Sequence, residues 1–151
     1  MKQVLSIAVL LFVFSYTSLA QVYEYKVVTT IESIVPNGMG RSRMISANEN
    51  RDYKEFTTTR SEEDNERNKS DRGDIRVKGF DETKLLNFYN LGGIRFQNIA
   101  ANDAVVNSKL NTMAQDGWEL AFVSSGVESD AGKDDANGIF ITRYVFKRLK
   151  K

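Results

Sequence analysis

Gly117-Trp118-Glu119-Leu120-Ala121-Phe122-Val123 joins a helical pattern directly to a strand pattern, with no loop between them. Upstream of it, four apolar residues recur at helical spacing: Val106, Leu110, Met113 and Ala114. Asn102 or Asp103 provides the expected N-cap, and a glycine at position 117 favours a left-handed C-terminal cap. We therefore expect one principal helix that reverses at once into a strand.

Two further stretches have strong strand patterns. The most hydrophobic one closes the chain and reads Ile139-Phe140-Ile141-Thr142-Arg143-Tyr144-Val145-Phe146-Lys147. It follows the strand at 118–123 after a polar loop at 124–138, so the two strands are expected to form an antiparallel hairpin. In residues 22–31, β-branched and aromatic side chains share one face: Tyr23, Tyr25, Val27, Thr29 and Ile31.

The middle third of the chain has weaker patterns. Residues 41–46 and 53–59 predict two more strands, poorer in apolar residues and peripheral. Residues 61–74 carry no aliphatic or aromatic side chain, which predicts a solvated loop or a disordered excursion. Residues 75–80 predict a short strand, whereas 85–89 form an apolar cluster of no assigned type. Together these patterns predict an α+β fold: an antiparallel sheet of about four or five strands with one principal helix packed on one face.

Three short motifs carry a resemblance to a known family. Tyr23-Glu24-Tyr25-Lys26-Val27-Val28, Gly117-Trp118-Glu119-Leu120 and Tyr144-Val145-Phe146-Lys147-Arg148 resemble domain-of-unknown-function family 4177 over residues 22–31 and 102–148. The resemblance implies a small bacterial β-α-β-β domain with its helix across an antiparallel sheet, and it implies no activity. Residues 33–101 would then be an inserted, partly flexible region. The overall style is similar to exported proteins of Bacteroidetes-type bacteria.

The first 20 residues have the organisation of a secretory signal peptide. Lys2 precedes an apolar run at 4–14, and Ser18-Leu19-Ala20 supplies small residues for cleavage near Ala20. A retained membrane anchor is the alternative, but the run is closer to ~11 residues than to the ~20 that cross a bilayer. We expect a single domain at 21–151 that is periplasmic or secreted, soluble, and without a membrane span.

Composition excludes several classes of partner and chemistry. Without Lys2, the 21 basic residues become 20 and equal the 20 acidic ones, which argues against a nucleic-acid partner. The chain has no cysteine and no histidine, so it lacks disulfides, a lipidated-cysteine anchor, Ser-His-Asp or Cys-His catalysis, and imidazole or thiolate metal sites. We therefore predict no catalytic, cofactor-binding or metal-binding residue.

Three weaker candidates remain. Glu119 lies in an apolar strand, but alternation directs it away from Trp118 and Leu120, toward solvent. Trp118, at the junction of helix and strand, is expected in the core. The loop at 128–138 concentrates oxygen ligands around Lys133, and either a cation site or a polar hairpin tip explains its composition.

Two functions remain open. The preferred one is a non-catalytic, exported interaction module that binds a protein or an envelope component through its sheet face or its long loops. The alternative is a small carboxylate-dependent hydrolase acting on envelope glycans, which requires a cleft with two facing carboxylates, at least one of them substantially buried.

Overall fold

The computed structural model describes residues 21–63, 66–129 and 138–150. The predicted signal peptide at 1–20 and most of the polar loop at 128–138 lie outside the described residues. No helix among the described residues is both long and apolar enough to cross a bilayer.

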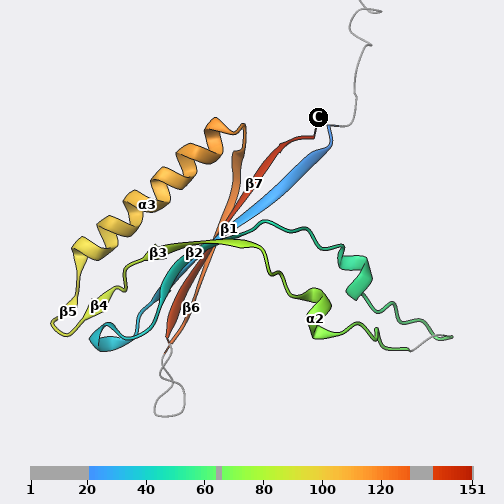
Figure 1. The fold of residues 1–151 in the computed structure, drawn as a ribbon, viewed down its shortest axis with the longest axis horizontal. Helices are drawn as coiled ribbons and strands as arrows, with labels where there is room; N and C mark the ends of the chain where they lie inside the picture. The colour runs from blue at the N-terminus through green and yellow to red at the C-terminus, as the bar shows by residue number, and fades with distance from the viewer. Residues whose placement is uncertain (1–20, 64–65, 130–137, 151) are drawn as a thin grey trace, which may run out of the picture.

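Five antiparallel strands form the main sheet, in the order β3-β2-β1-β7-β6 (Figure 1). Their bounds are β1 Tyr23–Ser33, β2 Ser42–Ala47, β3 Phe80–Leu85, β6 Glu119–Glu128 and β7 Ile139–Leu149. β1 pairs with β7 along its whole length, and β6 pairs with β7 as the predicted hairpin. A separate two-stranded ladder joins β4 (Tyr89–Asn90) to β5 (Gly93–Ile94).

One long helix, α3 (Phe96–Gln115), crosses one face of the sheet (Figure 1), and the predicted α+β class is confirmed. Between helix and sheet lies a core of five buried residues: Val28, Met44, Leu85, Met113 and Phe146. Trp118 packs against this core as the sequence predicted. The core is small because a single helix covers only part of a five-stranded sheet.

The C-terminus of α3 ends as predicted, but its N-terminus does not. Gly117 has φ +79°, and the Gly117 and Trp118 amides donate to the carbonyls of Ala114 and Met113, which is the Schellman arrangement. The helix begins at Phe96, so the expected N-cap at Asn102 or Asp103 is wrong. Asn102 is instead a buried residue within the helix, and its side chain bonds to the backbone of a neighbouring segment rather than to its own helix.

The segment 33–101 supplies two strands of the sheet. β2 lies between β1 and β3, so its predicted peripheral position is wrong. The predicted strand at 53–59 is also wrong, because a 3₁₀ turn, η2 (Tyr53–Phe56), forms there. The third correction concerns 75–80: a helical turn, α2 (Arg72–Ile75), occupies its start, and β3 begins only at Phe80. Single-residue propensities do not predict the inner position of β2 or the absence of a strand at 53–59. Whether a segment forms a strand, and where it lies in the sheet, depends on the strands with which it can pair.

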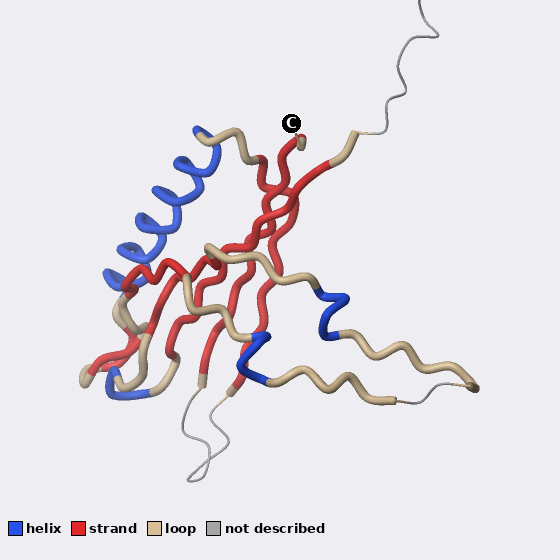
Figure 2. Tube along the Cα trace, turned by 45° about the vertical axis from the view of Figure 1, so that its right-hand side comes forward, coloured by secondary structure: helices blue, strands red, loops and turns tan. Residues whose placement is uncertain are grey.

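Residues 48–79 leave the sheet between β2 and β3 as an extended arm. The Asn48 amide donates to the Gly79 carbonyl at 2.9 Å and closes the arm at its base. In Figures 1 and 2, α3 lies to one side of the five strands and the arm extends to the other. A third short turn, η1 (Pro36–Gly38), connects β1 to β2.

The alternation in β1 is the one predicted, but its aromatic and β-branched face is turned away from the helix. Val28 and Thr30, each 1% exposed, face α3. Tyr25 and Val27 lie on the opposite face and are 63% and 44% exposed. We call this second side of the sheet, opposite α3, the open face.

Candidate functional site

A row of apolar residues crosses all five strands on the open face. Phe80 of β3 pairs with Ala47 of β2. Ala47 is next to Ser46, which pairs with Val28, so it lies beside Val27 of β1. Val27 pairs with Val145 of β7, and Val145 pairs with Phe122 of β6. We call these five residues the apolar row: Phe80, Ala47, Val27, Val145 and Phe122. Three of them are 44–62% exposed: Val27 on the central strand, and Phe80 and Phe122 on the two edge strands.

Charged residues flank the apolar row, and most are paired within the chain. Arg43 lies 2.5 Å from Glu82, and Lys147 lies 3.6 Å from Glu119. Arg143 stands on the same face and makes no ion pair with any described residue. Lys84, which is exposed and lies opposite Arg43 on the same face, also makes no ion pair with any described residue, so the open face is an apolar strip with two available cations near it.

Glu119 occupies this face as the sequence predicted. Its side chain is 71% exposed, and its partner is Lys147 rather than a second carboxylate. A glycosidase needs two carboxyl groups that flank a bond, with one of them in an environment that raises its pKa. Glu119 does not belong to such a pair, because the side chain next to it is Lys147.

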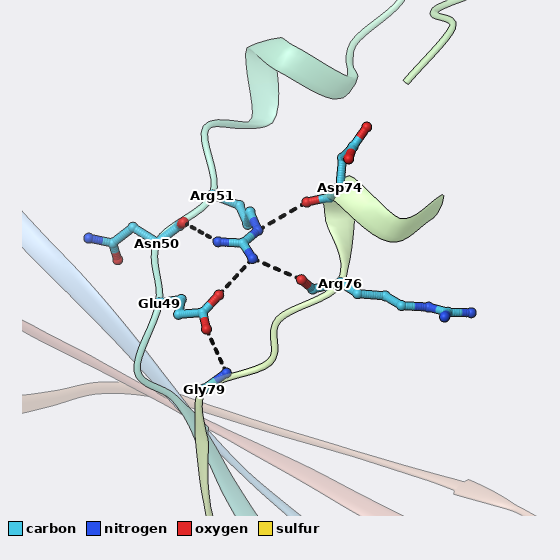
Figure 3. Close-up of polar contacts among 6 residues, drawn as sticks. All are labelled: Glu49, Asn50, Arg51, Asp74, Arg76 and Gly79. Atoms are coloured by element: carbon cyan, nitrogen blue, oxygen red, sulfur yellow. Dashed lines mark hydrogen bonds and ion pairs between the residues drawn. The ribbon is translucent and has the colours of Figure 1, made fainter. Parts of the chain in front are cut away.

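Arg51 fixes the base of the arm by binding both of its sides (Figure 3). Its guanidinium donates to the carbonyls of Asp74 and Arg76 at 3.2 and 2.8 Å, and to the Glu49 carboxylate at 2.6 Å. The other oxygen of Glu49 accepts from the Gly79 amide at 2.6 Å. These donors, Arg51 first and the backbone second, hold the pKa of Glu49 below its usual value.

A hollow of about 990 Å³ lies where the C-terminus of α3 meets the ends of β1 and β7. Arg148 lines this hollow and makes three contacts there. Its guanidinium lies 4.3 Å from the centre of the Trp118 ring and 2.5 Å from the Glu24 carboxylate. It also donates to the Asp116 carbonyl at 3.3 Å. Lys147 lies 5.2 Å from the centre of the Tyr23 ring. Lys147 and Arg148 are thus both paired with carboxylates of this chain. The contact of Arg148 with the Trp118 ring helps to hold Trp118 against the sheet.

A second, smaller hollow of about 350 Å³ lies within the arm. Asn68 organises it by donating from its side-chain amide to the Glu55 carbonyl at 2.8 Å, while its backbone amide donates to the Thr58 hydroxyl at 2.9 Å. These bonds join the outgoing and returning sides of the arm.

The half-buried carboxylate of Glu32 lies beneath α3. Asn102 donates to it at 2.7 Å, and the same asparagine accepts from the Leu86 amide and donates to the Leu86 carbonyl, each at 2.8 Å. Burial raises the pKa of Glu32, against the lowering effect of the Asn102 hydrogen bond, and the charge of Asp103 raises it further. The pKa of Tyr144 is also raised, by burial and then by the nearby carboxylates.

Glu32 carries no motif that marks it as a functional residue in the sequence. Alternation places Glu32 on the same face of β1 as Val28 and Thr30, but the sequence alone does not decide which face meets the helix. Glu32 lines neither of the two hollows described above. Among the described residues, no group of three acidic side chains gathers as a metal site would require.

Comparison with known proteins leaves the chain without an assigned relative. The predicted resemblance to family 4177 stays a prediction. Neither the protein-family models, nor the curated proteins, nor the solved structures include a match to this chain.

Proposed function

We propose that this protein is an exported, non-catalytic interaction module that binds a protein partner through its open face. One observation carries the proposal: the apolar row spans every strand of the sheet and remains largely exposed on the side opposite α3. Contiguous exposed apolar surface of this kind marks interaction sites in soluble proteins. The signal-like residues 1–20 support export.

The flanking charges indicate the chemistry of the partner. Arg43 and Lys147 are neutralised by Glu82 and Glu119, so the face can be covered without leaving those charges unpaired. Arg143 and Lys84 are the exceptions, and carboxylates on the partner would satisfy them. The expected partner therefore presents apolar side chains with acidic groups beside them.

Affinity capture tests this proposal. Tagged mature protein, residues 21–151, is used to capture partners from the periplasmic and secreted fractions, with V27K as the disrupting variant. Leu91 is 89% exposed in the turn between β4 and β5, so L91K is a matched apolar-to-lysine control away from the face. We expect a partner that wild type and L91K capture equally and V27K loses. Repeated failure to enrich any partner, or equal capture by all three, contradicts the proposal.

The carboxylate-dependent hydrolase is the second candidate, and Glu32 is the specific observation that favours it. A glutamate whose pKa is raised by burial, next to a second acidic residue, Asp103, has the properties of a general acid. The test measures release of reducing sugar from isolated envelope glycans by wild type, E32Q and D103N. Activity that disappears in E32Q while the fold is retained supports the hydrolase. Absence of activity in wild type ends it.

A further inference from the structure

β6 is an edge strand whose pairing with β7 is interrupted only by a β-bulge between Leu120 and Phe122, near its start. All ten of its residues are exposed, and four of them are large and apolar: Leu120, Phe122, Val123 and Val127. Its only charges, Glu119 and Glu128, stand at its two ends. A long apolar edge presents unpaired backbone donors and acceptors to any strand that can align with it.

The helix side of β6 is as uncovered as its outer edge. Leu120, Val123 and Val127 pair with residues of β7 that face α3, yet they are 42%, 43% and 62% exposed. α3 reaches both edge strands, yet these three side chains of β6 remain exposed beside it. A second helix on the same side would cover them.

The open-face side of β6 has a pattern that complements itself. Phe122, Ser124 and Gly126 alternate onto this face, because their partners on β7 are Val145, Arg143 and Ile141. Phe122 is 62% exposed. Above Gly126 there is open space, since an added Cβ would meet only the Ile141 side chain, at 3.9 Å. An aromatic ring across from a glycine on a neighbouring strand fills such a space.

We propose that two copies of this chain pair antiparallel through β6, centred on Ser124. In this register, Phe122 of each copy lies opposite Gly126 of the other, and Ser124 lies opposite itself. The two-fold axis is then perpendicular to the sheet. The product is one continuous sheet of ten strands with both α3 helices on the same side, and the bare residues Leu120, Val123 and Val127 between them. The inference stands independently of the proposed function.

A second copy fits this edge better than an unrelated extended peptide. Both the ring and the space that receives it are on the same strand, so one two-fold operation makes both contacts at once. The same operation brings the second helix to the side of the sheet where the layer is incomplete. A peptide would pair with the edge but would supply no helix.

The absence of cysteine from the natural sequence allows a direct test by single-cysteine crosslinking. Residues directly opposite in an antiparallel pair have Cα atoms about 4.5–5.5 Å apart, within disulfide range. S124C is therefore expected to form an intersubunit disulfide at least about tenfold faster than S125C, whose symmetric partner lies beyond the ~7 Å limit. Ser125 is the matched control, since it is the next residue of the same exposed strand. Equal rates for the two variants overturn the proposed register.

The molar mass in solution tests the dimer itself. Wild type is expected at twice the chain mass by light scattering, and V123K at the mass of one chain, because two added lysines meet near the two-fold axis. T83K places a lysine on the exposed part of β3, the opposite edge, and should remain dimeric. Circular dichroism confirms that each variant is folded, and if V123K is not, the S124C and S125C rates decide. A wild type that stays monomeric at the highest concentration tested overturns the proposal.

Discussion

The two edges of this sheet are opposite in character. β3 has six residues, and its exposed middle, Asp81-Glu82-Thr83-Lys84, is nearly all charged. β6 has ten residues and carries its charges only at its ends. Short, charged edge strands discourage pairing with other chains, and long apolar ones invite it. The difference teaches that one edge of this molecule is protected by its sequence while the other is left available for a partner.

The edges also differ in how they are fastened to the rest of the molecule. β3 ends at Leu85, which is 3% exposed in the core, and Asn102 then binds the backbone of the next residue, Leu86. β6 is held by its ladder to β7 and by Trp118 at its start. Both edges are thus held by a ladder on one side, but β3 ends on a core residue whereas all ten residues of β6 are exposed.

The largest expected effect breaks the anchor of β3. L85A should lower the free energy of unfolding by about 2–5 kcal/mol, because it removes a fully buried side chain from a small core. L120A on β6 should cost less than about 1 kcal/mol in the monomer, since Leu120 is already 42% exposed. Urea unfolding of both variants at low protein concentration measures the difference. Equal losses would mean that the two edges are anchored alike.

The next effect removes the polar link between α3 and the end of β3. N102L should lower the free energy of unfolding by about 1–3 kcal/mol, because the Leu86 amide and carbonyl lose their partner beneath the helix. N107L, on an exposed position of the same helix, is the control and should stay within about 0.5 kcal/mol of wild type. Thermal unfolding gives the stability, and hydrogen exchange at the Leu86 amide reports whether the link itself has opened.

A smaller effect separates two carboxylates near the ends of β3 by their pH dependence. The pKa of Glu32 is raised, so its ionised form disfavours folding, and wild type should gain stability relative to E32Q as pH falls through the raised value toward the ordinary glutamate pKa. The pKa of Glu49 is lowered, so wild type should lose stability relative to E49Q as pH falls from the ordinary value through the lowered one. Melting temperatures of wild type, E32Q and E49Q across this pH range give the sign of each difference. A difference between wild type and each variant that does not change with pH would contradict both pKa shifts.

The smallest effect concerns the charged pair that crosses from β2 to β3. Arg43 and Glu82 are 28% and 49% exposed, so solvent screens their attraction. E82Q should therefore change the free energy of unfolding by about 0–1 kcal/mol, and added salt should shrink the difference. Loss of more than this in a denaturant titration would show that the charges of β3 stabilise the fold as well as protecting its edge.

The sequence predicted which residues of β1 share a face, but it did not predict which of the two faces would remain open. The alternation that puts Val27 and Tyr25 on one face of β1 is a period-two pattern, and it was read correctly. Which face the helix would cover depends on the choice between Val28 and Val27, two residues of equal hydrophobicity. Propensity does not separate them, and only the packing of Met113 and Phe146 against Val28 decides it.

The sequence by itself determined the class of the fold, the Gly117 cap and the β6–β7 hairpin, because they follow from hydrophobic periodicity, from a glycine at a helix end and from two strands that are consecutive in the chain. It also determined which chemistry is excluded, since no arrangement of this chain can create a histidine or a cysteine. Only the tertiary structure decided that β2 is an inner strand, that Asn102 is a buried link, and that β6 is the exposed edge. Those three outcomes depend on which distant segments pair, and the free energy of pairing is shared between partners rather than encoded in either one.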